Sequence, residues 1–134
     1  MMKKILTIAL TMLMLVCVSC TSNAQQAKSQ KKDSDKVEVL YFHGKQRCKT
    51  CVAVGKFSEE LVKELGDAKV VWREVDLSTK DGERLGDKYE VVGSGLVVAR
   101  GGKGENLTRM AFSYALSDTP RFKAELKKEI ERKK

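Results

Sequence analysis

The segment from Val37 to Asp76 constrains the fold most, because strand-like and helix-like patterns alternate along it. Val37–His43 is an apolar, β-branched and aromatic run of strand length. From Cys48 to Leu65 apolar residues recur at helical spacing, and Gly66 follows as a natural helix stop. Lys69–Asp76 alternates well enough to be a second strand. Consecutive strands joined by a crossover helix pair in parallel, so this half of the chain predicts an α/β fold.

Between residues 79 and 113 we expect a second helix followed by a hairpin. The helix extends from about Thr79 to Tyr89 and is weakened by its glycines. Leu96–Arg100 is a short strand, Gly101–Gly104 is a turn, and Leu107–Ser113 is expected to return antiparallel as the hairpin partner.

The final helix has the clearest start signal. Asp118 or Thr119 provides the cap, and Pro120 takes the first helical position. The apolar face that follows consists of Phe122, Leu126 and Ile130. The predicted domain therefore covers residues 37–134 and has the order strand, helix, strand, helix, strand, strand, helix, which is a four-stranded mixed sheet with three helices.

Residues 1–20 are expected to be a signal peptide. Two lysines precede an uncharged apolar run from Ile5 to Val18, which is shorter than the roughly 20 residues that span a bilayer. Val18-Ser19-Cys20 resembles a bacterial lipobox, in which Cys20 is acylated, although Cys17 stands where such motifs usually have leucine. Ser22-Asn23-Ala24 offers ordinary cleavage after Ala24 instead. We therefore expect an exported protein, either a lipoprotein of the cell envelope or a soluble periplasmic protein.

Residues 21–36 are expected to be a flexible tether, because this polar stretch cannot bury apolar surface. The formal net charge of the chain is +8. Its cations are interleaved with acids, as in the segment from Lys123 to Glu129, so we predict a solvated surface and no nucleic-acid site. Contact with a membrane is expected only through a lipid at Cys20.

The main chemical signal is the C-x-x-C motif Cys48-Lys-Thr-Cys51, which follows a strand and opens a helix. Residues three apart on a helix share a face, so the two sulfurs can form a disulfide. The helix N-terminus favours an anion at Cys48, and Arg47 and Lys49 add positive charge. We therefore predict a Cys48 pKa below the roughly 8.5 of a free thiol, with Cys48 as the attacking thiolate and Cys51 as the resolving thiol.

Other interpretations of the motif stay open. A zinc or copper site normally needs further cysteines or histidines at ligand spacing, and the chain has a single histidine, His43. The alternative function is a non-catalytic binding module or a metal chaperone, in which the pair is a structural disulfide or a pair of metal ligands. His43 lies at the end of the first strand, where it either tunes the thiolate or only ends the strand. Trp72 and the aromatic residues Tyr41, Phe42, Phe57 and Phe122 are expected in the core.

With these residues in place, the chain resembles the thioredoxin superfamily in a compact form, from about Val37 to Arg132. Tyr41-Phe-His-Gly followed by Arg47-Cys-Lys-Thr-Cys51 resembles small exported thioredoxin-like proteins labelled nitrophenyl compound nitroreductase subunits. The resemblance implies thiol–disulfide exchange with a protein partner that carries a disulfide or dithiol. No flavin or nicotinamide motif is present, so no small-molecule cofactor is expected, and any part in nitroreduction is limited to passing electrons.

The chain departs from the thioredoxin pattern at two positions. Arg47 stands where thioredoxins carry a tryptophan before the first cysteine, and Gly95 replaces the cis-proline of the segment before the third strand. The proline presents backbone to the substrate and blocks metal at the thiols. Because a cis bond before a non-proline residue costs about 3 kcal/mol, we expect a trans bond before Gly95. We also expect altered substrate docking and easier adventitious metal binding.

Overall fold

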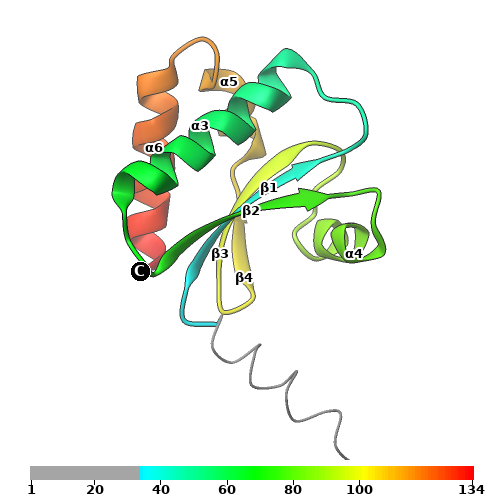
Figure 1. Ribbon diagram of the computed structural model, residues 1–134, viewed down its shortest axis with the longest axis horizontal. Helices are drawn as coiled ribbons and strands as arrows, with labels where there is room; N and C mark the ends of the chain where they lie inside the picture. Colours follow the sequence, from blue (N-terminus) through cyan, green and yellow to red (C-terminus); the bar gives the residue numbers. More distant parts are fainter. Residues whose placement is uncertain (1–33) are drawn as a thin grey trace, which may run out of the picture. The chain divides into compact units, whose positions relative to one another are not determined.

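The computed structural model of the chain describes residues 34–134, which form a four-stranded sheet covered by helices on both faces (Figure 1). The elements in chain order are β1 (Val37–His43), α3 (Lys49–Leu65), β2 (Val70–Asp76), α4 (Lys80–Lys88), β3 (Gly95–Arg100), β4 (Lys103–Asn106), α5 (Thr108–Tyr114) and α6 (Thr119–Lys133). The predicted signal peptide, both processing sites and nearly all of the predicted tether lie outside the described residues. Within residues 34–134, no helix is long and apolar enough to cross a membrane.

The strands lie in the order β2-β1-β3-β4. β1 pairs with β2 in parallel and with β3 antiparallel, and β3 pairs antiparallel with β4, so the mixed sheet predicted from the sequence is confirmed. The register places Tyr41 beside Glu74 and His43 beside Asp76 across β1 and β2. On the other side of β1, Phe42 is paired with Gly95. The carboxyl end of β1 and the start of β3 therefore meet at one end of the sheet.

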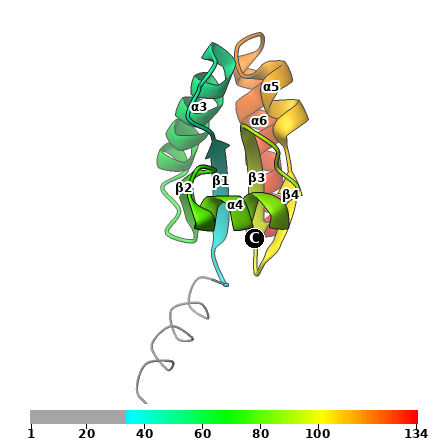
Figure 2. The same ribbon diagram turned by 90° about the vertical axis from the view of Figure 1, so that its right-hand side faces the viewer.

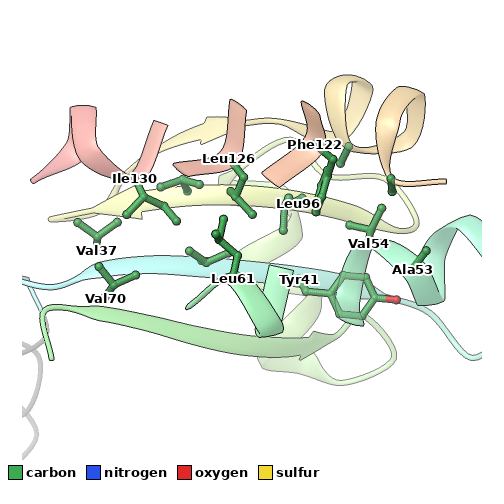
Figure 3. Packing of buried hydrophobic residues seen from close by; sticks show 14 residues of the cluster. Val37, Tyr41, Ala53, Val54, Leu61, Val70, Leu96, Phe122, Leu126 and Ile130 are labelled. Carbon is green, nitrogen blue, oxygen red and sulfur yellow. The ribbon is translucent and has the colours of Figure 1, made fainter. Parts of the chain in front are cut away.

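The helices divide between the two faces of the sheet. α3, α5 and α6 cover one face and α4 covers the other (Figure 2). The larger core lies under α3, α5 and α6; Figure 3 shows Val54 and Leu61 of α3 in one cluster with Phe122, Leu126 and Ile130 of α6. A smaller core under α4 contains Leu40, Phe42, Val75, Val91, Val97 and Ala99. The alternation of β1 supplies both cores, because successive side chains of a strand point to opposite faces.

Three predicted helices are confirmed together with the signals that begin and end them. Cys48 caps α3, and Gly66 ends it in the left-handed conformation, with φ 57°. Thr79 caps α4, its hydroxyl oxygen accepting from the Gly82 N–H at 3.0 Å. Asp118 caps α6, its carboxylate accepting from the Arg121 N–H at 3.1 Å. Local polar groups thus fix where each helix starts.

The prediction that Leu107–Ser113 is a strand was wrong. Gly101 and Gly102 both have positive φ, 58° and 79°, so they form a two-residue turn on their own. Lys103 then pairs directly with Arg100, and the hairpin partner is β4, whose first two residues lie in the segment expected to be a turn. The hairpin is completed at Asn106, before the expected strand begins.

Residues 108–114 form a fourth helix, α5, in the described part of the chain, where three were predicted. The Asn106 side chain accepts from the Thr108 N–H at 3.0 Å, which supplies a local start signal. Leu107, Ala111 and Ala115 follow one another at four-residue spacing, and both alanines are fully buried. That spacing is helical, and it places the small residues of α5 against the core.

Gly55 is the position on α3 where the helix approaches the sheet most tightly. A Cβ atom at Gly55 would lie 2.6 Å from Cε1 of Tyr41, well inside van der Waals contact. The Tyr41 ring cannot move aside easily, because it is 2% exposed and stacks on Trp72 with ring centroids 6.3 Å apart. The absence of a side chain at Gly55 therefore lets the first turns of α3 pack on β1.

We expect Gly55→Ala to lower the free energy of unfolding by about 1–3 kcal/mol, because overpacking against Tyr41 outweighs the gain of about 1 kcal/mol that alanine usually brings to a helix. Urea denaturation measures the change. Gly44→Ala is the matched control, since a Cβ at Gly44 meets no atom within 4 Å. A Gly55→Ala protein as stable as the parent would contradict this account of the packing.

Candidate active site

The two cysteines of the motif form a disulfide at the start of α3, with Cα atoms 5.0 Å apart. Cys48 is the N-cap residue and is exposed, and its Sγ accepts a hydrogen bond from the Cys51 N–H at 3.1 Å. Cys51 lies in the first turn and is only 6% exposed. A partner molecule can therefore reach Cys48, while Cys51 stays covered behind it.

The electrostatics at this end of α3 favour negative charge on Cys48. The first turn of the helix contains no acidic residue, and its unpaired N–H groups point toward the cap. Lys49 is the first helical residue and is exposed. Arg47 precedes Cys48 directly, but its guanidinium is engaged elsewhere.

Arg47 joins the cysteine loop to the neighbouring strands. Its Nη2 donates to Oε1 of Glu74 on β2 at 2.8 Å and lies 3.0 Å from Nε2 of His43. The same His43 nitrogen is 3.0 Å from Glu74 Oε1. The three groups form a triangle, which we call the Arg47 cluster: His43, Arg47 and Glu74. The His43 side chain is 8% exposed, whereas those of Arg47 and Glu74 are each 42% exposed.

The protonation of His43 decides which contact of the Arg47 cluster it completes. Its Nδ1 lies 3.1 Å from the Gly44 carbonyl oxygen and can donate to it. With Nδ1 carrying the proton, a neutral ring accepts at Nε2 from Arg47, whereas a protonated ring donates from Nε2 to Glu74. Either state keeps the end of β1 bound to the loop or to β2.

A shallow groove of about 250 Å³ runs beside α3 next to this cluster. Tyr41 and Trp72 are among its lining residues, and the Trp72 Nε1–H donates to Ser58 at 3.0 Å. The Tyr41 hydroxyl is buried and has no hydrogen-bond partner. Burial raises the pKa of Tyr41, Arg47 opposes this, and Glu74 adds to it. The phenol therefore stays protonated.

A second hollow of about 320 Å³ is lined by the Arg47 cluster and Asp76. Hydrogen bonds from Ser78 hold the pKa of Asp76 below its usual value, and the positive charges of His43 and Arg47 add to the effect. Two acidic and two basic side chains thus line one hollow at the ends of β1 and β2. Among residues 34–134, no group of three or more His, Cys, Asp or Glu side chains is placed to hold a metal ion.

No family model and no curated protein matches the sequence. Solved structures do match. A thioredoxin of Fasciola hepatica is similar over 83% of this chain and 93% of its own, with 23% identity and a TM-score of 0.56. A thioredoxin from Thermus thermophilus is similar over 81% of this chain and 82% of its own, with 24% identity and a TM-score of 0.50.

The chain has a thioredoxin-like fold. In this fold the disulfide lies at the start of α3, as expected from the resemblance. Of the predicted site residues, the structure brings together His43, Arg47, Cys48 and Cys51, with Lys49 exposed beside them. Gly95 lies at the same end of the sheet, opposite Phe42. Cys20 lies outside the described residues.

The thioredoxin-like fold is altered at Gly95, where thioredoxins are expected to carry a cis-proline. The described residues contain no cis peptide bond, so the bond before Gly95 is trans, as expected. The Thr108 Oγ1 fills the space where a side chain at position 95 would begin; a Cβ there would lie 2.7 Å from it and 2.6 Å from Val91 Cγ1. The same oxygen accepts from the Leu96 N–H at 3.2 Å. Thr108 and Gly95 are therefore fitted to each other.

Glu74 is the site residue that sequence reasoning missed. It lies in the middle of β2, two residues after Trp72, and strand alternation puts the two on one face. That signal was present in Trp72-Arg-Glu-Val-Asp76, but linking it to the cysteines requires the parallel register that pairs Glu74 with Tyr41. The register depends on the assembled sheet.

We expect Gly95→Ala to destabilise the protein by about 1–3 kcal/mol, because the added methyl group displaces Thr108 or Val91. The Leu96 amide should also exchange its hydrogen faster, since it loses the Thr108 acceptor. Urea denaturation and hydrogen exchange measure the two effects. Unchanged stability together with unchanged protection of Leu96 would disprove the fit between Gly95 and Thr108.

Proposed function

We propose that this chain is a thiol–disulfide oxidoreductase or electron relay of the cell envelope that acts through Cys48 and Cys51. The observation that carries the proposal is the asymmetry of the pair: one sulfur is exposed at a helix N-cap and the other is 6% exposed in the first turn. In a two-cysteine exchange cycle, an accessible thiolate attacks the partner and a second, nearby thiol resolves the mixed disulfide. The thioredoxin-like fold supports this choice of chemistry.

In the reducing direction, the Cys48 thiolate attacks one sulfur of a disulfide in a partner protein. The partner's disulfide breaks, a mixed disulfide with Cys48 forms, and the second partner sulfur leaves as a thiolate. Cys51 then loses its proton and attacks the Cys48 sulfur, which releases the first partner sulfur and forms the Cys48–Cys51 disulfide. Two electrons pass from the chain to the partner, and the same steps in reverse oxidise a dithiol.

The Arg47 cluster supports the attacking group without taking part in electron transfer. It lies beside Cys48 and binds the loop before it to β2 through Glu74. The resemblance to nitrophenyl compound nitroreductase subunits enters the proposal only as electron transfer through the cysteine pair to another protein. We propose no nitroreductase activity for the chain by itself.

We expect the protein to accelerate the reduction of insulin by dithiothreitol, because Cys48 can turn over between its dithiol and disulfide forms. Cys48→Ser should abolish the acceleration. Cys51→Ser should stop turnover but accumulate a mixed disulfide with the substrate, visible on non-reducing gels. Absence of turnover in the unmodified protein would favour a purely structural disulfide and overturn the proposal.

For location we propose export and, at the first of the two processing sites, acylation of Cys20. In a bacterial host the full chain should incorporate labelled palmitate and fractionate with membranes, and Cys20→Ala should lose the label. Cys17→Ala is the matched control and should keep it. An unlabelled, soluble mature protein that begins at Gln25 would contradict acylation and support cleavage after Ala24.

A further inference from the structure

Arg47 is the residue before Cys48, and its guanidinium is held by residues of the sheet. Its Nη2 lies 2.8 Å from Glu74 Oε1 and 3.0 Å from His43 Nε2. Both partners belong to the sheet: His43 ends β1, and Glu74 lies in β2. One of the two positive charges adjacent to Cys48 in sequence is therefore partly neutralised by the carboxylate of Glu74, which lies 27 residues after Arg47 in the chain.

We infer that Glu74 is a positioning residue for the cysteine pair: it holds the Arg47 guanidinium on β2 and thereby sets how much positive charge reaches the Cys48 sulfur. The inference rests on the proposed function, because it concerns the same pair. It assigns to Glu74 the regulation of how strongly the site oxidises its partners.

The geometry supports a role through Arg47. Glu74 carries the negative charge of the Arg47 cluster. Its Oε1 lies 2.8 Å from Arg47 Nη2 and 3.0 Å from His43 Nε2. His43 cannot replace Glu74 as the anionic partner of Arg47, because its Nε2 either accepts from the guanidinium or donates to Glu74. Removing the carboxylate charge leaves Arg47 without its hydrogen-bonded anionic partner. Its charge then acts on Asp76, which lines the same hollow, and on the thiolate of Cys48, the next residue in the chain.

A thiolate that is better stabilised favours the reduced form of the pair. In the equilibrium with glutathione, one Cys48–Cys51 disulfide and two glutathione thiols give the dithiol and one glutathione disulfide, with two electrons transferred. We expect Glu74→Gln to shift this equilibrium toward the dithiol by about two- to fivefold, the size of a half-exposed ion pair, which is roughly 10–20 mV. The Cys48 pKa, measured by iodoacetamide alkylation of the Cys51→Ser protein against pH, should fall.

The control is Glu38→Gln, which removes the same charge from another pair between β1 and β2, Glu38 with Arg73 at 3.2 Å. It should leave both the glutathione equilibrium and the Cys48 pKa unchanged. Arg47→Gln should shift them in the opposite direction to Glu74→Gln. In the Arg47→Gln background, Glu74→Gln should have no further effect, because its action passes through Arg47.

A shift of the same size in the Arg47→Gln background would overturn the inference, since Glu74 would then act through space on its own. Equal readouts for Glu74→Gln and Glu38→Gln would also overturn it. The alkylation measurement needs neither turnover nor a protein partner. A protein that fails to reduce insulin therefore disproves the proposed function, whereas an unchanged Cys48 alkylation profile in Glu74→Gln disproves the role of Glu74.

Discussion

The hydrogen bond from the Cys51 N–H to the Cys48 sulfur is the interaction on which the rest of the site depends. It makes Cys48 the cap of α3, so the atom that begins the helix is also the proposed nucleophile. The neighbouring elements help to hold Cys48 in that position. β1 delivers the loop to the right end of the sheet, and Gly55 allows the helix to lie close on the Tyr41 ring. The residue that caps the helix and the proposed redox residue are therefore the same.

The sheet places negative charge on one side of the site. The helix end and Lys49 supply positive potential from one side, while Glu74 and Asp76 approach from β2 on the other. The parallel pairing of β1 and β2 brings these acids beside His43, whose Nε2 lies 3.0 Å from both the Glu74 carboxylate and the Arg47 guanidinium. Thioredoxins are expected to have a tryptophan at the position of Arg47. Here the charged side chain of Arg47 contacts Glu74 of the sheet instead. The residue next to the Cys48 sulfur therefore differs between this chain and thioredoxins.

The sequence predicted the parts of the fold that depend on local signals. The β1 run, the caps at Cys48 and Asp118, the left-handed stop at Gly66 and the C-x-x-C spacing all act over a few residues. Prediction failed where a glycine pair made a tighter turn than expected, so that β4 came early and α5 took the place of a strand. Glu74 was missed for a different reason. Its partners lie across a strand pairing whose register no local pattern fixes, so only the assembled sheet identifies it.

The single tryptophan of the chain lies within this arrangement. Trp72 stacks on Tyr41, which packs under Gly55, and its indole N–H donates to Ser58 in the middle of α3. All tryptophan fluorescence therefore originates from one place, between the edge strand and the helix that carries the cysteines. The emission of this indole therefore depends on how the helix that carries the cysteines packs against β2.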